Sequence, residues 1–342
     1  MSTRFPAPPR PGDRIGVTAP SSGVPHALRP RLGFAVEHLR RAGFEVVLGD
    51  CLGAGDGVVS APAVDRAAEL TAMLTDPGTA AVVPPWGGEL AVDLLPHLDW
   101  SALAAADPTW LVGFSDISTL LLPLTLRTGT ATLHGQDLLD TPHPVPAPLL
   151  SWLDVAGADP GSELVQGATD RHLRGEPVDW RRRPHCTRRR YRERGTWQPL
   201  APGPVHARGR LVGGCLDTVS TLAGTPWGDV PAFAAAQAPE GVLLYLDVAE
   251  HPAYDVARDL WRLRLAGWFD AATAVLVGRT RAPGSRDLTQ AQAVAHVLGD
   301  LGVPVVLDVD LGHVPPQLAL VNGADAELVL DGERRQLTQW LR

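Results

Sequence analysis

The chain of 342 residues contains no lysine, so all 30 of its basic residues other than histidine are arginines. This absence excludes every mechanism that needs an ε-amine, including a P-loop lysine, a Schiff base and a serine–lysine dyad. Cysteine is also scarce, and no two cysteines form a CxxC pair: they are Cys51, Cys186 and Cys215. An odd number of scattered cysteines fits neither a disulfide framework nor a thiolate zinc site.

Long apolar runs and positive net charge are missing as well. No stretch approaches the ~20 apolar residues needed to cross a bilayer. The segment from Met1 to Arg14 is broken by four prolines and has no apolar core of the kind found in signal peptides. The net charge of −8 provides no overall basic field for a nucleic acid polymer or an anionic membrane. We therefore expect a cytoplasmic protein that binds neither.

What the sequence does contain, over its first 150 residues, is an alternation of strands and helices. The apolar pattern predicts strands over 14–19, 44–48, 80–84 and 110–113, and helices over 32–42 and 64–74. Such alternation is typical of a parallel sheet with helices on both faces. Sites in these sheets lie at the carboxyl ends of the strands. Gly87-Gly88 and Phe114-Ser115-Asp116 both follow predicted strands.

The remainder of the chain divides into two parts. Four prolines between 142 and 148 form a stiff connector, and an arginine-rich stretch runs from Trp180 to Arg194. From Val205 onward, strands are predicted over 242–246, 274–277, 303–307 and 327–330, with a helix over 254–266. We therefore predict an N-terminal α/β nucleophile domain (1–150), a linker with an arginine-rich surface loop (151–204) and a C-terminal domain (205–342).

Two side chains are candidates for nucleophilic catalysis, and each also has an ordinary structural interpretation. Ser115 follows an apolar strand and precedes an apolar helix, where a hydroxyl lies beside unpaired helix amides that can hold an oxyanion. It could equally be a helix N-cap, with Asp116 in the first turn. A GxSxG elbow is absent because Ile117 replaces its second glycine. His313 follows a strand, where most histidines are simply satisfied structural residues.

No metal or cofactor is expected from the sequence. The HExxH motif of zinc peptidases is absent, and no group of histidine, cysteine and aspartate has the spacing of metal ligands along the chain.

Considered together, the motifs resemble those of the LD-carboxypeptidase family and its microcin C self-immunity branch over nearly the whole chain. The matching blocks are Ala19-Pro20-Ser21-Ser22, Trp86-Gly87-Gly88, Leu94 to Trp100, Val112 to Asp116, His134-Gly135, Leu211 to Leu216, Gly224-Thr225-Pro226, Gly312-His313 and Asn322-Gly323. The expected fold is α/β: an N-terminal parallel-sheet, flavodoxin-like domain with helices on both faces, plus a smaller C-terminal β-rich α/β domain. The resemblance also implies a homodimer.

The resemblance implies a Ser-Glu-His triad with an oxyanion hole made of backbone amides. Carried over residue by residue, Ser115 is the nucleophile, His313 is the general base, and Gly88 and Asp116 donate the amides. Because Ser115 and His313 come from opposite ends of the chain, we expect them to meet at a domain interface.

The third triad position departs from the family pattern. An ungapped alignment places Asp247 where the family has glutamate, with the family's arginine found eleven residues later as Arg258. Aspartate can orient an imidazole, but it is one methylene shorter. Either His313 lies closer, or the triad is weakened, or Glu250 takes the role from the next turn. We favour Asp247.

Two tryptophans bear on the substrate. Trp86 stands where many murein-directed members have arginine, and Trp180 lies near the place of a loop tryptophan that stacks on adenine in the microcin-immunity branch. Arginines beside Trp180 could meet a phosphate; alternatively, Trp180 packs within the linker and the arginines are solvated. Three hypotheses follow: hydrolysis of an aminoacyl- or peptidyl-nucleotide, removal of D-alanine from a murein tetrapeptide, or non-catalytic binding of a small molecule by a decayed triad.

Overall fold

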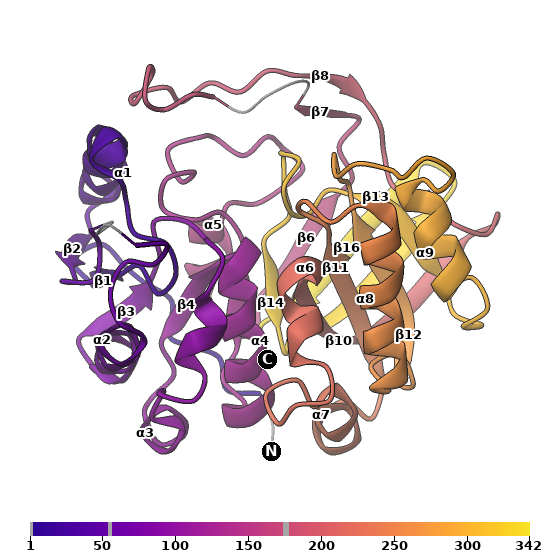
Figure 1. The fold of residues 1–342 in the computed structure, drawn as a ribbon, viewed down its shortest axis with the longest axis horizontal. Coiled ribbons are helices and arrows are strands. Elements are labelled where there is room, and N and C mark those ends of the chain that lie inside the picture. The colour runs from indigo at the N-terminus through magenta and orange to yellow at the C-terminus, as the bar shows by residue number, and fades with distance from the viewer. Residues whose placement is uncertain (1–2, 54–56, 174–177) are drawn as a thin grey trace.

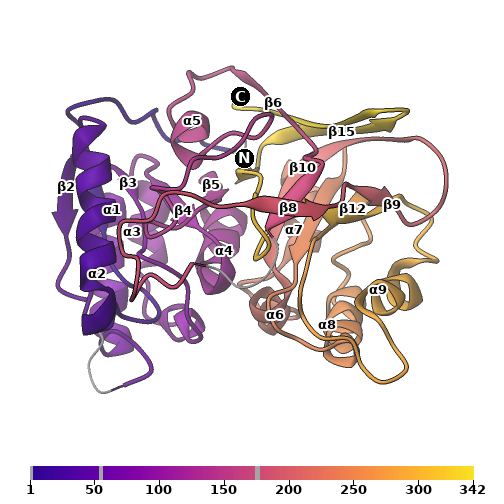
Figure 2. The ribbon, with the colours of Figure 1, turned by 90° about the horizontal axis from the view of Figure 1, so that it is seen from above.

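The computed structural model describes residues 3–53, 57–173 and 178–342. Two sheets lie side by side, with the N-terminal half in indigo and magenta and the C-terminal half in orange and yellow (Figures 1 and 2). Within the described residues, no helix combines the length and the apolar character required to cross a membrane.

The N-terminal sheet has the strand order β14-β5-β4-β3-β1-β2. β1 to β5 pair in parallel, and β14 adds an antiparallel edge against β5. The order 2-1-3-4-5 is that of flavodoxin-like folds, so the predicted fold of this half is confirmed. The strands are β1 (Arg14–Val17), β2 (Glu45–Leu48), β3 (Thr79–Val82), β4 (Trp110–Gly113), β5 (Thr132–His134) and β14 (Leu320–Asn322).

Helices cover both faces of this sheet because apolar residues recur at intervals of three and four. α1 and α5 contribute to the core on one face, while α2, α3 and α4 contribute to a core on the other that continues into the helices of the C-terminal half. These helices are α1 (Arg29–Arg41), α2 (Ala63–Thr75), α3 (Trp100–Ala105), α4 (Ser118–Thr128) and α5 (Trp152–Ala156). The shared core joins the two halves through packed apolar side chains.

The C-terminal sheet has the order β6-β16-β15-β10-β11-β12-β13-β9. Its central run from β10 to β13 is parallel and its flanking pairs are antiparallel. The strands are β6 (Glu163–Gly167), β9 (Gln198–Pro199), β10 (Val205–Cys215), β11 (Val242–Asp247), β12 (Ala272–Gly278), β13 (Val305–Val309), β15 (Asp325–Asp331) and β16 (Arg334–Trp340). The helices are α6 (Leu216–Val219), α7 (Val230–Gln237), α8 (Ala253–Leu265) and α9 (Gln290–Leu298).

The segment 151–204 has more regular structure than the sequence predicted. It contains α5, β6 and β9, and a two-stranded sheet of β7 (Arg171–Leu173) and β8 (Tyr191–Arg194) that lies at the top of Figure 1. The buried Arg31 on α1 donates hydrogen bonds to the carbonyl oxygens of Leu139, Pro184 and Cys186, which ties the arginine-rich stretch to the N-terminal half. Residues 174–177 of the predicted loop lie outside the described residues. The division into domains stays a prediction.

A buried carboxylate, Asp310, holds two parts of the same segment beside the C-terminal sheet. Asp310 is completely buried and accepts hydrogen bonds from the backbone and hydroxyl of Thr169, from Nε1 of Trp197 at 2.9 Å and from Arg279 at 2.8 Å. A charge buried in this way is tolerated because it is paired and fully hydrogen-bonded. Trp197 is therefore a structural anchor.

Candidate active site

The nucleophile candidate lies on a strained turn at the carboxyl end of β4. The chain leaves β4 at Gly113 and enters a short 3-10 turn, Ser115–Ile117, before α4 begins at Ser118. Ser115 has a φ of 59°, in the left-handed region, which costs roughly 1–2 kcal/mol for a residue with a Cβ. Strain of this kind is concentrated at functional sites. The N-caps of the 3-10 turn and of α4 are Phe114 and Ile117, so Ser115 is not the N-cap that its local sequence allowed.

The loop that follows β3 approaches Ser115 closely at Gly87. A Cβ built on Gly87 would lie 2.9 Å from Ser115 Cβ and 3.1 Å from both the Asp116 amide nitrogen and Ser115 Oγ. A side chain at this position would therefore collide with the serine, and glycine avoids the collision. The neighbouring Gly88 has a φ of 145°, and a Cβ there would lie 2.4 Å from the hydroxyls of Ser21 and Ser22. The paired glycines thus bring backbone, rather than side chains, up to the serine.

The Asp116 side chain holds three loops together. It is buried and accepts hydrogen bonds from Ser21 Oγ at 2.5 Å, the Ala91 amide at 2.8 Å and the Thr119 hydroxyl at 3.4 Å. These donors lie after β1, after β3 and in α4. Burial raises the pKa of Asp116, and these hydrogen bonds oppose the shift. The sequence assigned a role only to the backbone amide of Asp116, because a carboxylate in a first helical turn carries no signal of such long-range partners.

His313 contacts both other members of the expected triad. Its Nε2 lies 2.9 Å from Ser115 Oγ and its Nδ1 lies 2.7 Å from Asp247 Oδ2. Burial lowers the pKa of His313, but the charge and hydrogen bond of Asp247 outweigh it, and the net shift is upward from 6.5. The residues expected to meet from opposite ends of the chain therefore do so within hydrogen-bonding distance.

Asp247 reaches His313 because the backbone carrying the histidine lies directly against it. Gly312 has a φ of 82°, and a Cβ there would lie 2.3 Å from the Asp247 Cβ. Only glycine allows this approach. Asp247 is completely buried, whereas Glu250 is exposed and makes no hydrogen bond to His313 within the described chain. Of the alternatives drawn from the sequence, this geometry corresponds to a histidine that lies closer.

The second oxygen of Asp247 faces a buried histidine that the sequence placed only in a motif. His134 Nε2 lies 3.7 Å from Asp247 Oδ1, and burial lowers the pKa of His134 to about 4, which keeps the ring neutral. Its ring packs against those of Phe114 and Tyr245. Burial raises the pKa of Asp247, but His313 and then His134 outweigh it, so the net shift is downward. The position of His134 at the end of β5, beside β4, was the available sequence signal.

Three potential metal ligands also converge here. The ligand atoms of Cys215, Asp247 and His313 all lie within 4.8 Å of one another, although they are far apart in sequence. β10 and β11 pair Cys215 with Asp247 in register. Burial raises the pKa of the Cys215 thiol well above its usual value, and a protonated thiol is a poor metal ligand. That the site uses no metal stays a prediction.

Ser115 and His313 line two adjoining cavities. One, of about 320 Å³, is bounded on the other side by Glu89, Asp217, Glu250 and His251; we call it the acidic cavity. The other, of about 490 Å³, is bounded by Trp86, Leu139, Asp140 and Trp180, and it shares Glu89 and Glu250 with the first; we call it the tryptophan cavity. A substrate whose scissile bond lies at Ser115 therefore has room for a group on each side.

Trp180 lies in the wall of the tryptophan cavity on a scaffold of buried polar groups. The Arg31 guanidinium lies 4.9 Å from its ring centroid, and the His143 ring is stacked at 6.2 Å. Its indole Nε1 is buried without a hydrogen-bond partner in the described structure. Of the flanking arginines, Arg189 pairs with Asp140 beside the cavity. Trp180 thus packs against Arg31 and His143 and also lines the cavity, so both interpretations of it describe part of its surroundings.

Comparison with known proteins identifies the family. The description "LD-carboxypeptidase N-terminal domain" matches residues 15–135, and "LD-carboxypeptidase C-terminal domain" matches residues 208–328. A proposed carboxypeptidase of Streptomyces coelicolor is 33% identical, with 95% of this chain and 93% of the relative covered. The murein tetrapeptide carboxypeptidase of Pseudomonas aeruginosa is 29% identical over 73% of this chain and 71% of its own length.

The microcin C7 self-immunity protein MccF of Escherichia coli is 25% identical, with 97% of this chain and 95% of MccF covered. The solved structure of MccF with glutamyl sulfamoyl guanosine superposes with a TM-score of 0.82 at 22% identity, covering 100% of this chain and 99% of that one. At this identity the likeness shows a common fold. Taken with the two domain matches and the Streptomyces relative, it completes the assignment: the chain belongs to the LD-carboxypeptidase family.

Proposed function

We propose that the chain is a serine hydrolase that cleaves the amide-type bond between an acyl group and a nucleotide in an aminoacyl- or peptidyl-nucleotide. The observation that carries the proposal is the unbroken series of hydrogen bonds from Ser115 through His313 to Asp247. A nucleophile, a base and a buried acid in this order are the requirements for acyl transfer through a covalent intermediate.

In the proposed reaction, His313 Nε2 takes the proton of Ser115 Oγ as the oxygen attacks the substrate carbonyl. Asp247 stabilises the imidazolium that forms and keeps the remaining proton on Nδ1. The amides of Gly88 and Asp116 donate hydrogen bonds to the oxyanion, on the side of Ser115 where glycine at position 87 keeps side chains away. His313 then returns its proton to the leaving nitrogen, and water releases the acyl group by the same steps.

The tryptophan cavity supports a nucleotide as the leaving group. Trp86 and Trp180 offer aromatic faces on which a base can stack, a contact worth roughly 1–3 kcal/mol. MccF, which shares the fold, has been solved with aspartyl sulfamoyl adenosine. The proposal places the base against Trp180 and the acyl group in the acidic cavity.

The alternative substrate is a murein tetrapeptide, which the name of the Pseudomonas relative supports. Two measurements test the proposal: labelling of the protein with a fluorophosphonate, and mass analysis of products after incubation with an aminoacyl sulfamoyl adenosine or a murein tetrapeptide. We expect labelling of wild type but not of Ser115→Ala, and cleavage of the nucleotide. Cleavage of the tetrapeptide alone would favour the alternative, and an unreactive Ser115 would favour the non-catalytic binding protein. A homodimer, which the resemblance implies, stays a prediction.

A further inference from the structure

The acidic cavity carries more negative charge than its own residues neutralise. Among the described residues, four carboxylates and two histidines line it, and no arginine does. Two of these carboxylates have structural partners. Asp116 is hydrogen-bonded as described above, and Asp217 accepts hydrogen bonds from the amides of residues 249, 250 and 251 at 2.8–3.1 Å.

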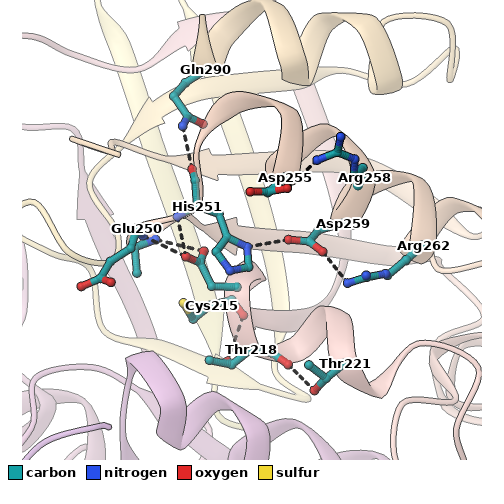
Figure 3. Close-up of polar contacts among 12 residues, drawn as sticks. Cys215, Thr218, Thr221, Glu250, His251, Asp255, Arg258, Asp259, Arg262 and Gln290 are labelled. Atoms are coloured by element: carbon teal, nitrogen blue, oxygen red, sulfur yellow. Dashed lines mark hydrogen bonds and ion pairs between the residues drawn. The ribbon is translucent and has the colours of Figure 1, made fainter. Parts of the chain in front are cut away.

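The other two carboxylates have no such partners. Glu89, after β3, and Glu250, after β11, are exposed, and neither side chain has a hydrogen bond or ion pair within the described residues. Figure 3 shows the Glu250 carboxylate directed away from the contacts of His251. The pKa of Glu89 is raised by burial first and then by the charges of Glu250, Asp116 and Asp217. The two free carboxylates thus repel each other across the cavity that holds Ser115.

His251, the wall residue opposite, does not supply the missing positive charge. Its Nδ1 lies 2.7 Å from Asp259 Oδ2, and Asp259 also pairs with Arg262 at 2.8 Å (Figure 3). Burial lowers the pKa of His251, but its hydrogen bond to Asp259 and the charge of Asp217 give a net upward shift. Because Asp259 is shared with Arg262, a protonated His251 offsets at most one of the four carboxylates that line the cavity.

We propose that the acidic cavity binds an acyl residue with a cationic side chain of the lysyl or ornithyl type, and that Glu89 and Glu250 determine this specificity. The inference rests on the proposed function, because this cavity holds the acyl group only if the reaction takes place at Ser115 and His313. Its volume of about 320 Å³ is at the low end for ligand sites and suits a single side chain.

The remaining walls fit the same substrate. Val92, Thr119 and Thr221 are uncharged and can line an alkyl stem, while the ammonium group reaches the free carboxylates. MccF has been solved with aspartyl and glutamyl ligands. An acidic side chain of that kind would meet like charge here, which costs binding energy. The acyl side chain that we propose for this chain therefore carries the opposite charge to the side chains of those ligands.

The test compares three substrates that differ only in the acyl side chain: lysyl, norleucyl and glutamyl sulfamoyl adenosine. We expect kcat/KM to be roughly tenfold higher for lysyl than for norleucyl, with glutamyl lowest, as for a charge-assisted contact at a partly exposed site. The double variant Glu89→Gln/Glu250→Gln should reduce the lysyl-to-norleucyl ratio to about one. The control Glu333→Gln, in an exposed turn after β15, should keep the ratio of wild type.

Calorimetry with the Ser115→Ala variant separates this inference from the hydrolase proposal. Tighter binding of the lysyl compound supports the specificity, whether or not wild type cleaves the three compounds. If wild type cleaves none of them, that failure counts against the proposed function alone. Equal binding of the three, preference for the glutamyl compound, or no binding of any of them overturns the specificity. Active hydrolysis with an unchanged ratio in the double variant overturns the roles of Glu89 and Glu250.

Discussion

Replacing Asp247 by asparagine removes one charge from the site while keeping the shape of the side chain. Asp247 is completely buried, so solvent does not screen its interaction with the His313 imidazole 2.7 Å away. The asparagine amide can instead donate a hydrogen bond to Nδ1. That contact favours the tautomer with its proton on Nε2, the nitrogen that lies 2.9 Å from Ser115 Oγ. In this tautomer His313 cannot accept the serine proton.

The expected loss follows from this change of tautomer and from the missing charge on the imidazolium. The same substitution in a Ser-His-Asp triad costs on the order of 10⁴-fold in kcat, or about 5.4 kcal/mol of transition-state stabilisation. We expect a fall of about 10³- to 10⁴-fold in kcat for Asp247→Asn. KM should change by less than about threefold, because Asp247 lines neither cavity.

Steady-state kinetics on the substrate that wild type cleaves fastest provides the assay. Asp247→Glu keeps the charge but adds a methylene where Gly312 already lies in close contact, so we expect a smaller loss than for asparagine. Asp107→Asn, at an exposed site before β4, is the matched control and should behave as wild type. The reasoning would be refuted by an Asp247→Asn enzyme that retains more than about a tenth of kcat, or by Glu250→Gln being the crippling change for every substrate.

Four further predictions use the same preparations. Ser115→Ala should fold normally, as judged by circular dichroism, yet lose at least ~10³-fold in kcat, because it removes only the attacking hydroxyl. The kcat/KM profile should fall as the pH is lowered through a pKa above 6.5, since His313 must be neutral to act as base and its pKa is raised; Asp247→Asn should move this limb to lower pH. His134→Asn should lower kcat by roughly tenfold with KM unchanged, because this ring touches the catalytic acid and lines neither cavity. Asp310→Ala should lower the free energy of unfolding, measured in urea, by about 3–5 kcal/mol, because it leaves a buried arginine unpaired.

The strands and helices that carry local periodicity could be predicted from the sequence. The strand over 110–113 coincides with β4, and the helix over 254–266 lies within one residue of α8 at each end. The pairing of β14 with β5 could not be predicted, since three residues near position 320 join a sheet built from the first 134. Periodicity describes which face of a strand is buried and says nothing about which distant strand it pairs with.

The same distinction applies to the candidate site. Ser115 and His313 were identified because family motifs surround them, and Asp247 because its neighbours aligned without a gap. The polar side chains that support the site were missed, among them Arg31 and His134. Their partners are backbone carbonyls and a buried carboxylate that lie far away in the sequence. A single arginine or histidine in a helix or strand is uninformative until the fold supplies its neighbours.

In the proposed mechanism the two halves of the molecule contribute different parts of the chemistry, and the reason lies in their topology. The carboxyl ends of β1, β3 and β4 lead to the serine, the paired glycines and the buried Asp116 that binds their loops together. The carboxyl ends of β10, β11 and β13 lead to Cys215, Asp247 and the loop of His313. Because parallel strands direct their carboxyl ends to one edge, two such edges facing each other bring a nucleophile from one sheet to a base and acid from the other. The length of the side chain at position 247 then sets how closely the loop that carries His313 must approach it. Gly312 permits the approach that the shorter aspartate requires, so a larger residue at position 312 should disable the enzyme even with Asp247 intact, as a Gly312→Ala variant would test by its kcat.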